Sequence, residues 1–233
     1  MTHREYRLES DPSLTPSPVV PALVWGEGIE PPVPTEAMPA MLERLLDRVG
    51  AAGEEFVPPE MRQRVRKMLR YGKYKPSGRS KPASEFLLRA ALSDSFPLVN
   101  GPVDANNIVS LESGLPGSIF DAGLSGRHLL LRHGASDESY VFNPSGQSID
   151  LQDLLLVCRL TEDGWEPCGN PVKDSMATKI QPETTDVVAI LYAPIDEPLK
   201  AIERWAGRYA ELLDRLCGAV AVGFRVGLDV GAD

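Results

Sequence analysis

The sequence is poor in the residues that most catalytic and metal centres use. Its 233 residues include three cysteines and three histidines, which nowhere form a zinc-ligand spacing such as C-x-x-C. An odd number of irregularly spaced cysteines argues against a disulfide framework and indicates a reducing compartment. The chain also lacks a G-x-S-x-G nucleophile motif and a complete phosphate-binding loop. The sequence therefore predicts no metal, no cofactor and no catalytic triad.

Long hydrophobic runs are absent as well. No stretch of eighteen consecutive apolar residues occurs, which excludes a transmembrane helix. Residues 1–11 are polar and charged, a pattern that predicts no signal peptide. A hydrophobic share of 42% and a charged share of 24% are typical of globular proteins with a buried core. We therefore expect a globular protein of the cytoplasm.

Charge is distributed unevenly along the chain. The 33 acidic residues outnumber the 24 basic ones, which gives a net charge of −9. The stretch from Arg62 to Lys81 nevertheless contains no acidic residue, and Tyr71 and Tyr74 lie within it. Such a stretch predicts contact with a polyanion such as tRNA, with the tyrosines stacking on bases, although a solvated basic face is the alternative. This basic segment comprises Arg62, Arg64, Arg66, Lys67, Arg70, Lys73, Lys75, Arg79 and Lys81.

Apolar periodicity predicts both helices and strands. The predicted helices are 38–49, 59–71, 83–92, 102–113 and 196–217, and Gly50 and Gly114 are expected to end the first and fourth. The predicted strands are 19–25, 118–121, 128–132, 139–142, 154–159 and 187–193. Pro21 places the first of these strands at a sheet edge.

Because the helices and strands are partly segregated, the predicted class is α+β. We expect a single compact domain with a central mixed or antiparallel sheet flanked by helices, and a sheet that contains strands 118–121, 128–132 and 187–193. Along the chain, we expect a proline-rich segment and helix at 1–60 packed on the core, a basic helix and loop at 61–82, the main domain at 83–217 and a tail at 218–233.

Residues 107–121 read N-I-V-S-L-E-S-G-L-P-G-S-I-F-D. This stretch resembles the signature of the B3/B4 domain of the phenylalanyl-tRNA synthetase beta subunit, an Asn-x-Val-x-Leu-Glu-x-Gly-x-Pro helix and turn before a strand that ends in Phe-Asp. Residues 169–175 and 183–188 add to the resemblance, which covers about residues 80–195. It implies the B3/B4 fold and a tRNA-linked role. In freestanding form, that role is hydrolysis of an amino acid wrongly esterified to tRNA, where polar groups position a water.

The resemblance also implies where a site would lie. If the fold is shared, the 106–118 and 170–178 segments meet in one pocket that is rich in short polar side chains. In many bacterial members a histidine takes the place of Ser118, where serine can hydrogen-bond a water. By charge complementarity, Lys173 would favour a developing oxyanion or a terminal phosphate, and Asp174 would orient the ammonium group of the ligand. We therefore expect catalytic roles for Ser118, Lys173 and Asp174, and substrate binding by Asn106, Asn107, Ser110, Asn170, Ser175 and Thr178.

Two other functions stay open. A non-catalytic RNA-binding accessory module is the first, because Ser118 cannot act as a base near neutral pH without an activating neighbour. An amino-acid-binding protein that does not use RNA is the second. Charging of tRNA is not expected, since no class II synthetase motif is present. Arg132 and Glu138 are expected to form a structural ion pair outside the site.

Overall fold

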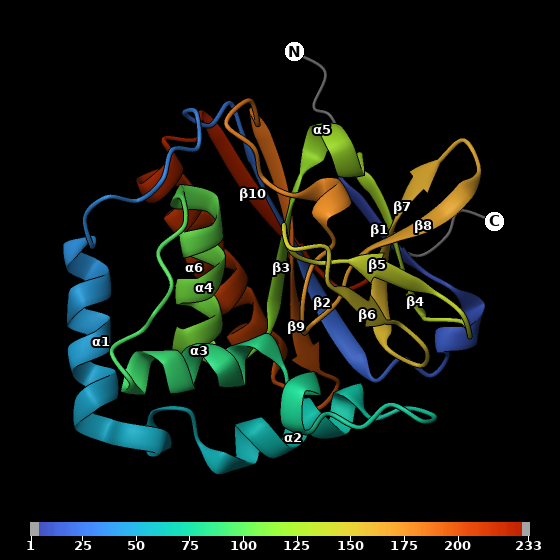
Figure 1. Cartoon of the computed structure of the whole chain (residues 1–233), viewed down its shortest axis with the longest axis horizontal. Coiled ribbons are helices and arrows are strands. Elements are labelled where there is room, and N and C mark those ends of the chain that lie inside the picture. The colour runs from blue at the N-terminus through green and yellow to red at the C-terminus, as the bar shows by residue number, and fades with distance from the viewer. Residues whose placement is uncertain (1–4, 230–233) are drawn as a thin grey trace.

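Two four-stranded β-sheets pack together, and helices cover the outer face of one of them (Figure 1). The computed structural model describes residues 5–229. The mixed sheet has the order β1 (Arg7–Ser10), β4 (His128–His133), β7 (Leu155–Thr161) and β8 (Gly164–Gly169). The antiparallel sheet has the order β10 (Ala221–Val226), β2 (Val19–Glu27), β9 (Asp186–Pro194) and β3 (Gly117–Asp121). A short hairpin consists of β5 (Ser139–Val141) and β6 (Ser148–Asp150).

The helices lie mainly beside the antiparallel sheet. They are α1 (Ala40–Ala52), α2 (Pro59–Leu69), α3 (Ala83–Leu92), α4 (Gly101–Ser113), α5 (Ala122–Ser125) and α6 (Leu199–Cys217). Helix α6 packs on β2 and β10, α4 packs on α6 and β3, and α3 and α1 follow outward (Figure 1). The predicted α+β class, with mixed and antiparallel sheets flanked by helices, is confirmed. Across residues 5–229, no helix combines the length and apolar character needed to cross a bilayer.

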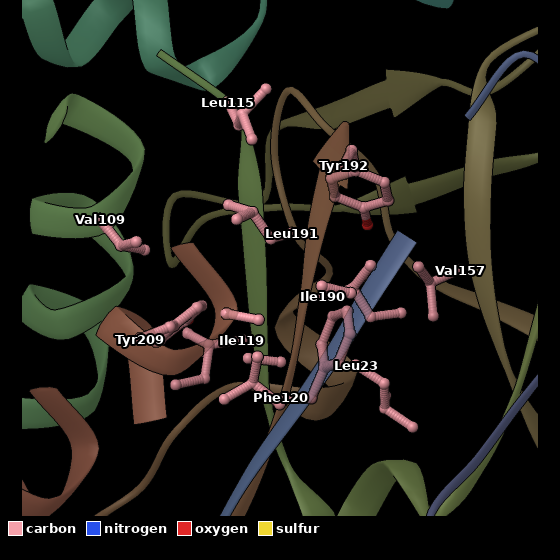
Figure 2. Packing of buried hydrophobic residues seen from close by; sticks show 14 of the residues in the cluster. Leu23, Val109, Leu115, Ile119, Phe120, Val157, Ile190, Leu191, Tyr192 and Tyr209 are labelled. Atoms are coloured by element: carbon pink, nitrogen blue, oxygen red, sulfur yellow. The ribbon is translucent and has the colours of Figure 1, made fainter. Parts of the chain in front are cut away.

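The core has two layers, one on each face of β9. Successive side chains of a strand point to opposite faces, so Leu191 lies on the side of Val109 in α4, whereas Ile190 lies on the side of Val157 in the mixed sheet (Figure 2). Residues 187–193 are all fully buried. A strand that is covered on both faces needs apolar residues at every position, which explains the uninterrupted apolar run.

The prediction that strands 118–121, 128–132 and 187–193 share a sheet is wrong for one of them. Strand β3 pairs with β9, but β4 pairs with β1 and β7 in the mixed sheet. Periodicity identifies a buried strand without identifying its partner, because both sheets bury their strands in the same core. Residues 218–229, expected as part of a tail, supply β10, and residues 1–60 supply β1, β2 and α1.

The edge position predicted for β2 is also wrong. Strand β2 lies between β10 and β9, although it contains Pro21. The Pro21 carbonyl accepts the Gly227 N–H at 2.8 Å, so the polar groups of Pro21 face β10. The last pair in the register between β2 and β10 is Ala22 with Val226, so Pro21 and Gly227 lie just beyond the end of the paired region. The missing N–H of Pro21 therefore costs only the return bond to Gly227, at the very end of this ladder.

Helix α1 ends later than its glycines suggested. Gly50 was expected to stop the helix, but α1 continues through it to Ala52. Gly53 ends the helix with a φ of +62°, and its N–H bonds to the Val49 carbonyl. The two glycines compete as stop signals, and the one whose backbone takes the positive φ marks the end.

Replacing each of these glycines with alanine is expected to change the stability in opposite directions. A Cβ at Gly50 would meet nothing within 4 Å, so Gly50→Ala should raise the unfolding free energy by about 0.5–1 kcal/mol. Gly53→Ala should lower it by at least about 1 kcal/mol, because alanine is strained at positive φ. Urea denaturation of both variants checks this, and equal effects would contradict the assigned helix end.

Candidate functional site

A cavity of about 290 Å³ lies between α4, β3 and the loop at 170–180. It contains six of the nine site residues expected from the two polar segments. These are Asn106, Asn107, Asn170, Lys173, Asp174 and Ser175. The structure thus brings the two segments together, as expected from the shared-fold argument. Apolar walls come from Val103, Ile119, Phe142, Val172 and Ile180.

Helix α4 approaches β3 closely because Gly117 has no side chain. A Cβ at Gly117 would lie 2.5 Å from Asn106 Oδ1 and 3.1 Å from Ser110 Oγ. Asn106 accepts a hydrogen bond from the Tyr209 hydroxyl at 2.9 Å and donates one to the Gly117 carbonyl at 3.4 Å. Asn106 therefore joins α4, α6 and β3, and most of its hydrogen-bonding capacity is already used.

Asn107 differs from its neighbour in having a free amide. It is half-buried and lines the cavity. Within residues 5–229 its side chain makes no hydrogen bond. A carboxamide has two donors and an acceptor, so Asn107 can bind a polar ligand without giving up an internal hydrogen bond.

Asp174 binds the free edge of β3. Its carboxylate accepts the backbone N–H of Ile119 at 3.2 Å and that of Asn170 at 3.3 Å. Burial raises the pKa of Asp174 to about 7, although hydrogen bonds from Ser118 and the two N–H groups, and the charge of Lys179, oppose this rise. Asp174 is thus a structural contact that also titrates near neutral pH.

The loop that carries Lys173 is held by Asn170 and Tyr140. Asn170 Oδ1 accepts the N–H groups of Val172 at 2.8 Å and Lys173 at 2.9 Å. Its amide donates to the Tyr140 hydroxyl at 2.6 Å, and that hydroxyl donates to the Lys173 carbonyl at 2.6 Å. Tyr140 was not among the expected site residues, because the sequence marked it as one position in a short strand.

Two lysines reach the cavity. Lys173 Nζ lies 3.7 Å from the centre of the Phe142 ring, a cation–π contact. Lys179, which sequence reasoning missed, lines the cavity and forms no ion pair within residues 5–229. Two ammonium groups beside one carboxylate give the cavity a positive charge, which favours ligands with anionic or polar oxygens.

Ser118 lies behind the cavity, so its position does not fit the catalytic role expected for it. Gly117 and Ile119 face the cavity, and the residue between them must point to the opposite face of β3. The Ser118 side chain is fully buried, 3.0 Å from the Tyr192 hydroxyl and 3.3 Å from the Asn170 carbonyl. It can support Asp174 but does not reach a ligand in the cavity.

The remaining polar residues of the two segments either form hydrogen bonds within the protein or are buried away from the cavity. Ser175 Oγ accepts the Ala177 N–H at 3.1 Å and caps a short helical turn. Thr178 is buried and donates to the Cys168 carbonyl at 3.4 Å. Ser110 is buried without a hydrogen-bond partner among the described residues. Neither Thr178 nor Ser110 lies in the cavity wall, so the substrate-binding role expected for them is not matched by their positions.

The basic segment forms α2 and the following loop, and three of its arginines are paired with acidic side chains. Arg64 contacts Asp196 at 3.0 Å and Glu197 at 2.8 Å, and Arg66 makes two 2.5 Å bonds to Glu85. Arg62 lies 3.5 Å from Glu54. The other six residues form no ion pair within residues 5–229, namely Lys67, Arg70, Lys73, Lys75, Arg79 and Lys81.

The two tyrosines of the basic segment differ in exposure. Tyr74 is buried, and its hydroxyl donates to the Ser80 carbonyl at 2.6 Å. The prediction that Tyr74 can stack on a base is therefore wrong. Tyr71 is exposed but stacks on His133 with ring centres 3.6 Å apart. Separately, the predicted ion pair between Arg132 and Glu138 is confirmed at 2.6 Å. In the described part of the chain, no three His, Cys, Asp or Glu residues are grouped to hold a metal ion.

Comparisons with known proteins show a distant structural likeness. No family model and no curated protein matches the chain. Among solved structures, the chain is similar to an N-terminal fragment of the phenylalanyl-tRNA synthetase beta-subunit from Pyrococcus horikoshii, with 10% identity and a TM-score of 0.46. The likeness covers 94% of this chain and 50% of that one, so the chain spans half the length of the fragment. A TM-score this low does not establish a shared fold.

The raised pKa of Asp174 predicts how stability depends on pH. Between about pH 4 and pH 7 the folded protein holds a proton that the unfolded chain has released, so its stability falls as the pH rises through this window. Asp174→Asn removes the titrating group, and the unfolding free energy of D174N should lack this fall. Urea denaturation across the window measures the effect.

The control is Asp47→Asn at a position of α1 away from the cavity. It removes one carboxylate of the same kind, so it measures the effect of the substitution itself over the same pH range. A difference in unfolding free energy between D174N and the wild type that stays constant with pH would contradict the raised pKa of Asp174.

Proposed function

We propose that this protein is a trans-editing deacylase that hydrolyses misacylated tRNA. The observation that carries the proposal is the meeting of two chain segments in one cavity. Residues 107–121 and 169–175 each resemble B3/B4 editing domains in sequence, and although they are distant along the chain, both line the same cavity. We assign the hydrolytic unit to residues 83–217 and the tRNA contact to residues 61–82.

The size and lining of the cavity support an amino acid as its ligand. About 290 Å³ is at the lower end for ligand pockets, which suits an aminoacyl group better than a nucleotide cofactor. Apolar walls from Val103, Val172 and Ile180 can receive a side chain. The free amide of Asn107 can bind the polar backbone atoms of the amino acid.

The proposed reaction uses water and the groups in the cavity wall. Asp174, with a pKa near neutrality, takes a proton from water as the water oxygen attacks the ester carbonyl. The ammonium groups of Lys173 and Lys179 stabilise the oxyanion that develops. The bond between the carbonyl carbon and the ribose oxygen then breaks, the ribose oxygen takes the proton from Asp174, and a free amino acid and tRNA are released.

A second hollow supports a path from the basic segment to the cavity. It measures about 350 Å³ and shares Asn107, Val172 and Lys173 with the cavity. Arg79 of the basic segment also lines this hollow. A phosphate bound by Arg79 would therefore lie next to the opening through which a tRNA 3′ end enters.

The position of Ser118 favours a second candidate, a tRNA-binding module that does not catalyse hydrolysis. A serine behind the cavity wall cannot hold the attacking water, so hydrolysis depends on Asp174. A panel of misacylated tRNAs, scored for released amino acid, distinguishes the two functions. Release from at least one tRNA supports the deacylase, and tRNA binding without release supports the module.

Lys179→Ala tests the oxyanion role. We expect kcat/KM for deacylation to fall by about a hundredfold with little change in tRNA affinity, because removing one such donor typically has this effect. The matched control is Lys200→Ala, which removes the same charge from an exposed position of α6. Equal activities of the two variants would contradict the proposed role of Lys179.

Neutralising Lys73 and Lys75 to glutamine tests the tRNA contact. For each phosphate that is no longer neutralised, the plot of log affinity against log salt should flatten by about 0.7–0.9, so the slope should fall by roughly 1.4–1.8. The control pair is Arg44→Gln with Lys200→Gln, which removes the same charge from α1 and α6. Equal slopes for both pairs would contradict a specific contact at the basic segment.

A further inference from the structure

Strand β10 leaves half of its backbone hydrogen-bonding groups unpaired. The bond from the Gly227 N–H to the Pro21 carbonyl fixes the phase of its ladder with β2. In an antiparallel ladder, alternate residues face the partner strand, so Gly223 and Arg225 face β2, while Val222 and Phe224 face outward. Within residues 5–229, no hydrogen bond reaches these outward groups, and the main contacts of β10 are with β2 and α6.

The free edge of β10 is also apolar. The exposed fraction is 86% for Val220, 39% for Val222 and 41% for Phe224. No proline, lysine or bulge interrupts Ala221–Val226. These are devices by which proteins usually block the pairing of an edge strand with another chain.

Two other strand edges of the same molecule are covered. At β3, the Asp174 carboxylate accepts the outward N–H of Ile119. At β1, Asp229 binds both polar groups of Leu8, accepting its N–H at 2.7 Å and donating to its carbonyl at 2.8 Å. Strand β10 has no comparable cover among the described residues, and this contrast marks it as an interaction surface.

We propose that a second copy of this chain pairs with β10, strand against antiparallel strand, about a two-fold axis at Gly223. In this register the outward groups of Val222 meet those of Phe224 in the other copy. Each of the two symmetric pairs exchanges two hydrogen bonds. The two antiparallel sheets then form one continuous sheet of eight strands.

The strand is complementary to itself in this register. Val222 lies opposite Phe224 and Val220 lies opposite Val226, so aliphatic and aromatic side chains meet across the strands. The strands cross at Gly223, which has no side chain. Arg225 falls opposite Ala221 and is neutralised by Asp229 at 2.8 Å within its own chain. No like charges meet, which is why a second copy fits this edge.

The proposed pairing leaves the cavity open. Strands β10 and β3 lie at opposite edges of the antiparallel sheet (Figure 1), and the cavity lies beside β3. Each copy would therefore present its cavity away from the shared strand. The pairing is independent of the proposed deacylase activity, so either can fail without the other.

Sedimentation of the full chain tests the pairing. Concentrations from about 1 µM to 1 mM cover the range of weak association, and we expect a concentration-dependent dimer. The double variant V222K/F224K places like charges opposite each other and should raise the dimer dissociation constant at least about tenfold. The double variant V222E/F224K places Glu opposite Lys twice and should restore the dimer.

The control variant is V141K/L160K, which changes two exposed apolar residues on β5 and β7. It should dimerise like the wild type. A wild type that stays monomeric throughout would overturn the proposal, and loss of the dimer in both β10 variants would overturn the register.

Amide hydrogen exchange of the wild type tests the same contact without a mutation. The N–H groups of Val222 and Phe224 should exchange more slowly at high protein concentration than at low concentration, while that of Gly223, already bonded to β2, should change little. Equal exchange rates of Val222 and Phe224 at both concentrations would contradict the pairing.

Discussion

The hydrogen bonds from Ile119 and Asn170 to the Asp174 carboxylate are the constraint on which the cavity depends. The bond from Ile119 joins an irregular loop to the free edge of β3, where another strand would otherwise supply the acceptor. The bond from Asn170 lies within the loop and holds its shape. An unpaired N–H in a partly buried place costs free energy. The loop therefore cannot move away from β3 unless another acceptor takes the place of the Asp174 carboxylate. The position of Lys173, one residue earlier, follows from the same anchor.

The close approach at Gly117 sets the opposite wall. With a Cβ at position 117, the carboxamide of Asn106 would have to move away from β3, and this would disturb its hydrogen bond from Tyr209. The cavity is therefore the space left between a helix that can come close and a loop that is tied to a strand edge. Its polar groups come from both sides, which explains why their roles divide into anchors, such as Asn106, and free groups, such as Asn107.

Local signals in the sequence were sufficient to predict much of this arrangement. Contacts between residues that lie far apart in the chain could not be predicted from it. Helix α3 has the predicted bounds, and Gly114 ends α4 as expected, since caps and periodicity are local. The sequence also indicated that two polar segments share a pocket. It could not show that Arg64 pairs with Asp196, 132 residues away, or that Lys179 turns into the cavity. Strand alternation alone would have placed the Ser118 side chain on the face of β3 opposite to α4, if it had been known that Gly117 faces α4.

The anchor at β3 and the proposed chemistry impose opposite demands on one carboxylate. Two N–H donors and Lys179 stabilise the ionised form of Asp174, whereas burial destabilises it more strongly, and the balance brings its pKa close to neutrality. An acid held only by donors would be a firm anchor but a weak base, since donors lower its pKa. An acid buried without donors would stay protonated and would hold the loop poorly. The observed mixture of donors and burial is the arrangement in which the same group can hold the loop and accept a proton.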